Sequence, residues 1–326
     1  EQFQNERKFS EVKGLIRKEG NKVIINSIQS LISNLDDIPP YDYSLFDKRI
    51  FYRAYNSKIV KAVDYELSRG CVYACSYCVE TTIQNYYGFS ETTESGVLKN
   101  ANQYLRHKSA NRIFSELEKN YESFGIELFR CQDTNFLTID QHTLLELSDL
   151  MEKSNLPIKL YIETRPEGIN KSTVKLLKKL HVDGVGMGVE VSSESFRKSD
   201  LNRHPAQRKI IEAFRILKEA GIKRTAYNII GLPNETEEMV IDTIQFNSIL
   251  QPDNITVHFY SPYLGTNLEK KSKESGIFDA YDYGVDSQLR TVARSKLEQK
   301  QLEFYKRNFN RLVKEGLGNL DRLKKA

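Results

Sequence analysis

Residues Ser68–Cys78 read SRGCVYACSYC and contain three of the chain's four cysteines, Cys71, Cys75 and Cys78. Successive thiols are four and then three residues apart. Three thiols this close together cannot all pair as disulfides, and such spacing usually indicates a shared metal. Zinc and iron–sulfur clusters both normally take four ligands, whereas this loop supplies three. The spacing therefore predicts a metal centre with one position left open.

The composition is that of an ordinary globular protein, with 326 residues, 39% hydrophobic and 28% charged. No apolar run is long enough for a spanning helix, and residues 1–8 contain no apolar signal core. Four cysteines in a chain this long, three of them clustered, are typical of a reducing compartment. We therefore expect a cytoplasmic protein without a membrane partner. A net charge of +4 is too small to indicate a nucleic-acid partner.

Apolar runs alternate with helical periodicity from residue 62 onward. Six strands are expected, at 62–68, 126–129, 158–162, 184–191, 224–230 and 255–260. Strands that alternate with helices predict parallel β/α units, in which sites form at the carboxyl ends of the strands. The cysteine loop follows the first expected strand, so we place it at that edge.

Three regions are expected along the chain. Residues 1–60 comprise a hairpin at 14–25 and a proline-containing connector at 35–46, residues 61–270 form the core, and residues 271–326 form a helical extension. An amphipathic helix is expected from about Gln288 to Glu315. We interpret its basic residues as a solvated face in preference to a surface for an acidic partner or nucleic acid.

Structural zinc is the alternative to an iron–sulfur cluster, with Cys131 or a histidine as the fourth ligand. Paired zinc knuckles supply their ligands two by two, whereas here three come from one loop. The histidines are scattered without ligand spacing, at His107, His142, His181, His204 and His258. Core cysteines without any metal are a further alternative. The pattern favours the cluster.

The loop, with Tyr77 directly before its last cysteine, resembles the signature of the radical S-adenosylmethionine (radical SAM) superfamily. Four later motifs are similar to that family in order, at 188–190, 202–204, 231–236 and 262–266. The resemblance implies an α/β fold, a partial (β/α)6 TIM-like barrel with an N-terminal connector and a C-terminal helix. It also implies a [4Fe–4S] cluster on the three thiolates, reductive cleavage of S-adenosylmethionine (SAM), and a 5′-deoxyadenosyl radical that abstracts hydrogen.

The resemblance also implies roles for single residues. Tyr77 is expected near the adenine of SAM, and Glu190 and Ser192 near its ribose or methionine part. Arg203 is expected beside the carboxylate of SAM. The second expected strand departs from the family, because Cys131–Asn135 stand where many relatives have Gly-Gly-Glu.

Asp133 is therefore a candidate for the amino group of SAM. Glu163 is a further candidate cofactor contact, although a surface ion pair with Arg165 is an equal alternative. Cys131 is a candidate catalytic hydrogen donor, against the alternative of a small buried residue. With one cysteine beyond the three ligands, a second cysteine-bound cluster cannot be built, which argues against methylthiotransferases.

Residues 14–46 resemble the connector that joins a cobalamin-binding domain to the barrel in one branch of the family. No Asp-x-His-x-x-Gly cobalamin signature occurs, and too few residues precede Gly14 for such a domain. Either the domain has been removed or the protein lost it; the absent initiator Met favours removal. Cobalamin is thus expected only through a missing domain.

The function expected from the resemblance is radical methylation, or a related carbon modification, of a small metabolite. Flavodoxin or ferredoxin is the expected electron donor. The first alternative is a cobalamin-independent radical SAM enzyme acting on a natural-product or metabolic intermediate. The second, from another class, is a non-catalytic binding subunit that the metal stabilises.

Overall fold

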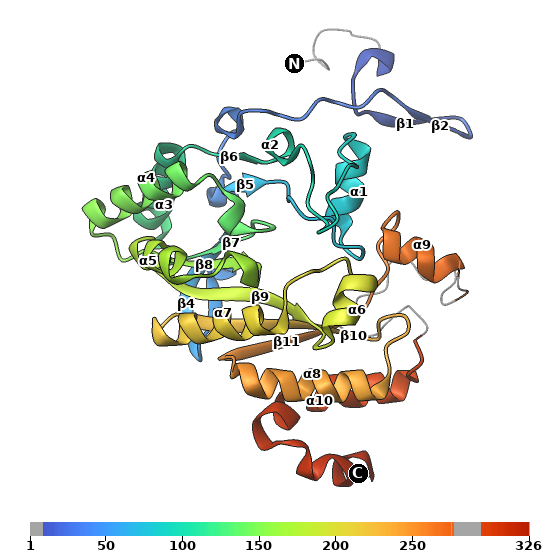
Figure 1. Cartoon of the computed structure of the whole chain (residues 1–326). Coiled ribbons are helices and arrows are strands. Elements are labelled where there is room, and N and C mark those ends of the chain that lie inside the picture. The colour runs from blue at the N-terminus through green and yellow to red at the C-terminus, as the bar shows by residue number, and fades with distance from the viewer. Residues whose placement is uncertain (1–8, 275, 277–294, 326) are drawn as a thin grey trace. The chain divides into compact units, whose positions relative to one another are not determined.

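The computed structural model describes residues 9–274, 276 and 295–325 (Figure 1). The chain divides into two compact units, one up to Ser33 and one from Asn34 onward. In the smaller unit, β1 (Ile16–Glu19) pairs antiparallel with β2 (Lys22–Ile25). Gly20 lies in the turn between them with a φ of +59°, which glycine adopts without strain. The predicted hairpin is confirmed.

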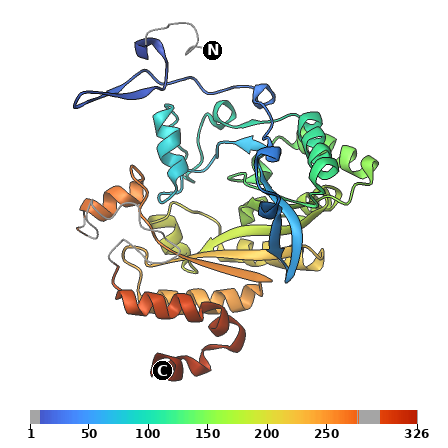
Figure 2. The ribbon, with the colours of Figure 1, turned by 180° about the vertical axis from the view of Figure 1, so that it is seen from behind.

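A seven-stranded sheet with the order β11-β10-β9-β8-β7-β4-β3 forms the centre of the larger unit. Its strands are β3 (Tyr52–Tyr55), β4 (Lys58–Tyr65), β7 (Leu128–Cys131), β8 (Lys159–Thr164), β9 (Val182–Glu190), β10 (Lys223–Ile230) and β11 (Asn254–Phe259). All neighbours from β4 to β11 pair parallel, which confirms the six predicted strands. The sheet is the curved wall of a partial barrel, so the predicted fold class is confirmed (Figure 2).

Strand β3 is an addition to the predicted elements. It pairs antiparallel with β4 through Asn56 and Ser57, whose φ angles are +48° and +61°, as tight hairpin turns require. Phe51, directly before β3, is 2% exposed and packs in the main core. The region boundary expected near residue 60 therefore falls inside the larger unit, because the preceding residues belong to its sheet and core.

Helices follow the strands as the periodicity predicts. They are α1 (Val79–Tyr86), α2 (Ala101–Tyr104), α3 (Ala110–Phe124), α4 (Gln141–Ser154), α5 (Lys171–Lys179), α6 (Glu194–Ser199), α7 (Gln207–Glu219), α8 (Glu237–Leu250), α9 (Asn267–Glu274), α10 (Gln299–Glu315) and α11 (Leu320–Lys325). Asp140 caps α4 by accepting from the backbone N–H groups of His142 and Thr143. The expected C-terminal helix is present as α10, and residues 288–294 lie outside the described residues.

The main core lies on one side of the sheet, between the strands and helices α3, α4, α5 and α7. Side chains of a strand alternate between its two sides, so every second residue faces these helices. On β7, Phe129 and Cys131 belong to the core, whereas Leu128 and Arg130 line a cavity on the other side. The helices thus cover one face of the sheet, and the opposite face is left for a site.

Helix α10 completes a second, smaller core. Leu302, Tyr305 and Phe309 of α10 are buried against β11 and α8. None of the helices in the described part of the chain combines the length and apolar character that a membrane span needs.

Leu177→Ala tests the packing of α5. Leu177 is fully buried in the main core, so its truncation should lower the free energy of unfolding by about 2–5 kcal/mol. Urea-induced unfolding followed by circular dichroism measures this change. Leu145→Ala on α4, where the side chain is 45% exposed, is the control and should cost less than about 1 kcal/mol. Equal losses in the two variants would contradict the described core.

Candidate active site

The cysteine loop begins where the short strand β5 (Ser68–Arg69) pairs antiparallel with β6 (Arg106–His107). Asp133, which follows the neighbouring strand β7, fixes this point. Its buried carboxylate accepts from the backbone N–H of Leu67 at 3.2 Å and of Ser68 at 2.6 Å, and from the Ser68 hydroxyl at 2.5 Å. Burial raises the pKa of Asp133 to about 6. Asp133 does not line the cavity in front of the thiols; its side chain holds the start of the loop.

Two further side chains hold the body of the loop. Gln84 of α1 is 1% exposed and donates to the carbonyl oxygens of Cys71 at 2.9 Å and Tyr73 at 3.1 Å. Asn202, which follows α6, donates to the carbonyl oxygen of Ala74 at 2.7 Å. An irregular buried segment needs such partners for its backbone groups. These contacts explain how a loop without regular secondary structure keeps a defined shape.

The three thiols of the loop line one cavity of about 180 Å³ near the carboxyl ends of β8 and β9. Burial raises the pKa of Cys71 to about 12 and that of Cys78 to about 11. Positive charge from a bound metal would hold them as thiolates near neutral pH. Within the described ranges, no three His, Cys, Asp or Glu side chains surround a position for a single ion. In a [4Fe–4S] cluster, by contrast, each thiolate binds a different iron.

Two arginines contact the sulfur of Cys75. Arg165 Nη1 donates to Cys75 Sγ at 3.3 Å, and its guanidinium stacks 3.7 Å from the centroid of the Tyr73 ring. Arg203 Nη1 is 4.0 Å from the same sulfur, and Arg203 Nη2 donates to the carbonyl oxygen of Gly188 at 2.7 Å. Both arginines are buried. Two positive charges thus lie where they stabilise negative charge on this ligand.

Tyr77, Glu190 and Arg203 form a network beside the thiols. The Tyr77 hydroxyl donates to Glu190 Oε1 at 2.9 Å, and Arg203 Nη1 lies 3.7 Å from the same oxygen. Burial raises the pKa of Tyr77, which keeps the phenol as a donor. A Cβ added to Gly188 would lie 2.1 Å from Glu190 Oε1. The glycine of this motif is therefore required to make room for the carboxylate.

Glu163 and Tyr227 lie between the thiol cavity and a larger cavity of about 620 Å³, and line both. The Tyr227 hydroxyl donates to Glu163 Oε1 at 3.0 Å, and burial raises the pKa of Glu163. Tyr227 also lines a third cavity, of about 360 Å³, together with Tyr77 and Glu190. A Cβ on Gly186 would lie 2.6 Å from the Tyr227 hydroxyl, so this glycine makes room for the tyrosine.

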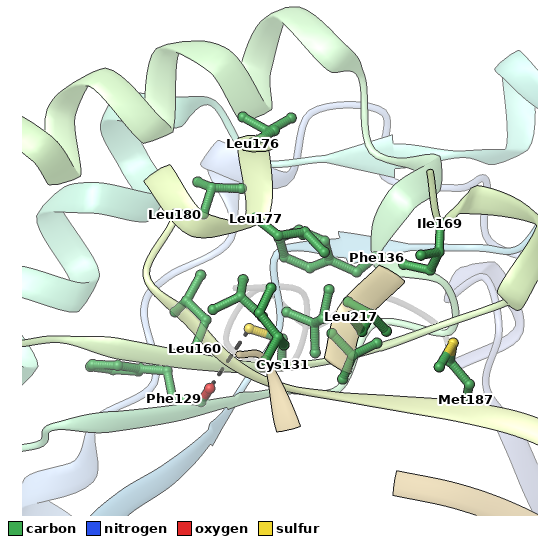
Figure 3. Packing of buried hydrophobic residues seen from close by; sticks show 14 of the residues in the cluster. Phe129, Cys131, Phe136, Leu160, Ile169, Leu176, Leu177, Leu180, Met187 and Leu217 are labelled. Atoms are coloured by element: carbon green, nitrogen blue, oxygen red, sulfur yellow. Dashed lines mark hydrogen bonds between the residues drawn. The ribbon is translucent and has the colours of Figure 1, made fainter. Parts of the chain in front are cut away.

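Cys131 and Ser192 are not brought to these cavities. Cys131 is 1% exposed and packs in the main core, with its sulfur 3.8 Å from the carbonyl oxygen of Phe129 (Figure 3). The alternation of side chains along β7 turns Cys131 away from the site, so the structure supports the alternative of a small buried residue. Ser192 is buried, and its backbone N–H donates to the Thr243 hydroxyl at 3.0 Å.

Tyr73 and Tyr227 also line the thiol cavity, and neither was predicted as a site residue from the sequence. Tyr73 lies within the cysteine loop, and its spacing from the cysteines does not indicate that its ring stacks on Arg165. Tyr227 could have been found from alternation on β10, where Ala226 belongs to the main core and Tyr227 lines the cavities on the opposite side. Asn202, singled out in the sequence as part of a motif, holds the loop and does not line the thiol cavity.

Comparison with known proteins identifies the family. Residues 65–246, more than half of the chain, match the sequence profile of the radical SAM superfamily. The chain belongs to the radical SAM superfamily. The resemblance seen in the cysteine loop is thereby confirmed, and the matched range contains all three clustered cysteines.

Proteins similar to this chain include the anaerobic magnesium-protoporphyrin IX monomethyl ester cyclase of Cereibacter sphaeroides, 24% identical over 290 residues, which are 88% of this chain and 43% of that protein. The hopanoid C-3 methylase of Methylococcus capsulatus is 27% identical over 254 residues, 77% of this chain and 43% of that protein. The chain thus spans about half the length of the curated relatives it matches.

The fold is similar to that of the radical SAM methyltransferase TsrM from Kitasatospora setae, solved with cobalamin and a [4Fe–4S] cluster bound. The TM-score is 0.61 at 16% identity, over 90% of this chain and 55% of that chain. At this identity the likeness shows the fold alone.

A buried carboxylate holds the turn that packs near Tyr77. Glu235, in the turn after β10, is fully buried and accepts from the backbone N–H of Gly231 at 2.5 Å and of Leu232 at 3.3 Å. Leu232 packs in a small core against which Tyr77 also packs. Burial raises the pKa of Glu235 to about 8.

Stability should therefore decrease as the pH rises from 5 to 8. The folded protein keeps a proton on Glu235 that the unfolded chain releases near pH 4.5, so the unfolded state gains relative stability as the pH rises. Glu235→Gln should reduce this decrease by roughly 1–3 kcal/mol. Urea unfolding at pH 5, 6, 7 and 8 measures it, with Glu238→Gln on the exposed start of α8 as the control. Parallel curves for wild type and Glu235→Gln would contradict the raised pKa.

Proposed function

We propose that this chain is the radical-generating barrel of an enzyme that cleaves SAM reductively and modifies a carbon of a small molecule, by methylation or a related reaction. One observation carries the proposal. Three thiols of a single loop line one cavity beside two buried arginines, Arg165 and Arg203, near the carboxyl ends of the strands. This is the edge at which barrels of this architecture hold their reactive groups.

The donor set fits a [4Fe–4S] cluster. Thiolates are the ligands that iron–sulfur clusters take, and one loop supplies three of them. The fourth cysteine is buried in the core on the other side of the sheet, so it does not complete a four-thiolate set. One iron would thus remain for SAM. When bound, the cluster and SAM supply the hard chemistry, an electron transfer that cleaves a carbon–sulfur bond and gives the 5′-deoxyadenosyl radical.

The chain's own residues would bind and orient SAM. Arg203 would hold its carboxylate, because Arg203 Nε is buried without a hydrogen-bond partner among the described residues. Tyr77 would supply an aromatic surface for the adenine, and Glu190 would accept from the ribose hydroxyls. Glu163 would accept from the amino group of SAM. Tyr227 donates to one of its two carboxylate oxygens, which leaves the second oxygen to accept.

The relatives support methylation or a related carbon modification as the reaction class, since one is named a methylase and another a cyclase. Flavodoxin or ferredoxin would supply the electron. The 326 residues contain no Asp-x-His-x-x-Gly signature, so cobalamin would be held by a segment outside them. The same observation favours a cobalamin-independent radical SAM enzyme as the second candidate.

Iron content tests the cluster. Protein reconstituted anaerobically with iron and sulfide should hold about four irons per chain and absorb broadly in the visible range. Cys71→Ala, Cys75→Ala and Cys78→Ala should each lose most of this iron. Cys131→Ala is the matched control and should retain it, because its sulfur lies in the core. One bound zinc and no iron in the wild type would overturn the proposal.

Arg203→Gln tests the binding of SAM. The reconstituted wild type should release 5′-deoxyadenosine from SAM in the presence of dithionite. Losing the cation should raise the KM for SAM by at least about tenfold, and Arg203→Lys should recover part of the loss. Product release at a series of SAM concentrations measures the effect, with iron content as the check on folding. Arg208→Gln, on the exposed side of α7, is the control; an unchanged KM in Arg203→Gln would remove the assigned role.

A further inference from the structure

The cavity of about 620 Å³ has no role in the chemistry described so far. It lies on the face of the sheet opposite the helices, between the first and last strands. Charged and polar side chains of β7, β8, β10 and β11 line it, among them Arg130, Tyr161, Glu163, Tyr227 and His258. It shares Glu163 and Tyr227 with the thiol cavity, so the two spaces adjoin. A molecule held here would lie next to bound SAM.

One wall of this cavity is aromatic. The rings of Tyr55 and Tyr161 are 6.0 Å apart and nearly perpendicular, at 83°. The hydroxyls of Tyr161 and Tyr227 are 2.9 Å apart, which joins the three tyrosines into one surface. Ala62 and Leu128 add apolar surface. Pockets lined in this way bind the flat or apolar body of a small molecule, and a few polar groups fix its orientation.

The two arginines that line this cavity, Arg53 and Arg130, differ in their partners. Arg53 forms an ion pair with Asp64 at 2.6 Å, so its charge is compensated. The guanidinium of Arg130 makes no hydrogen bond or ion pair within the described residues, and its carbon lies 6.0 Å from the Tyr161 ring centroid. Glu163 accepts from Tyr227, and the charge of Arg130 acts on this carboxylate without a hydrogen bond or ion pair between the two side chains. Arg130 therefore presents unused donors to the cavity, in the planar arrangement that binds a carboxylate through two hydrogen bonds.

We propose that this cavity is the substrate site, and that it takes a carboxylate-bearing molecule with an aromatic or similarly flat body. The carboxylate binds Arg130, and the body lies along Tyr161 and Tyr227 toward the thiol cavity. The substrate assignment rests on the proposed function, whereas the recognition of the carboxylate depends only on the cavity. Arg130 is in this view the residue that selects acids over neutral analogues.

Binding of 2-naphthoate to the reconstituted protein tests the inference, with neutral 2-naphthamide as the matched ligand. Because the chain contains no tryptophan, naphthalene fluorescence reports binding without tryptophan emission. The wild type should bind the acid at least about tenfold more tightly than the amide. Arg130→Gln should abolish this preference and Arg130→Lys should retain part of it. Arg53→Gln, which removes the compensated cation of the same cavity, is the control and should keep the preference.

Two results would overturn the inference: equal affinity of the wild type for acid and amide, or an unchanged preference in Arg130→Gln. Circular dichroism and iron content of each variant separate these results from misfolding. The measurement requires no turnover, so it fails independently of the proposed function. Absence of 5′-deoxyadenosine from the wild type would overturn the proposed function, and acid-selective binding lost in Arg130→Gln would still show an anion site.

Discussion

The backbone of the cysteine loop has to find hydrogen-bond partners outside regular secondary structure, and the site depends on this constraint. The partners come from distant parts of the chain. Asp133 follows β7, Gln84 belongs to α1 and Asn202 follows α6, and all three hold the segment from Leu67 to Ala74. The thiols reach one cavity only when β4, β7 and β9 take their places in the parallel sheet. Assembly of the ligand set therefore depends on formation of the fold.

Much of this arrangement could be predicted from the sequence, and the failures have physical causes. Periodicity identified the six parallel strands, and spacing identified the clustered thiols. The position of Cys131 at the end of a strand does not by itself show which side of the sheet its side chain faces. Since Phe129 is a core residue, alternation alone turns Cys131 into the core. Asp133 was different, because its partners, Leu67 and Ser68, follow β4 in the chain and no local pattern shows which strand will pair with β7.

Two glycines of β9 make room for two tyrosine–carboxylate hydrogen bonds of the site. Each carboxylate accepts from a tyrosine hydroxyl: Glu190 from Tyr77, and Glu163 from Tyr227. Gly188 leaves room for the first pair and Gly186 for the second. The absence of two side chains on one strand thus allows two hydrogen-bonded carboxylates to line the cavity that contains the thiols. This explains why the strand is rich in glycine although glycine weakens strands in general.

Tyr227 lines all three cavities on the open face of the sheet. In evolutionary terms, this position is pleiotropic. A substitution that reshapes the space of about 620 Å³ also changes the wall of the space of about 180 Å³ that contains the thiols. Relatives that diverge in their choice of small molecule would be expected to vary at Arg130 or Tyr55, which line one of these spaces, before they vary at Tyr227. In a redesign of the pocket for another molecule, substitutions at Arg130 or Tyr55 should likewise be tolerated better than substitutions at Tyr227.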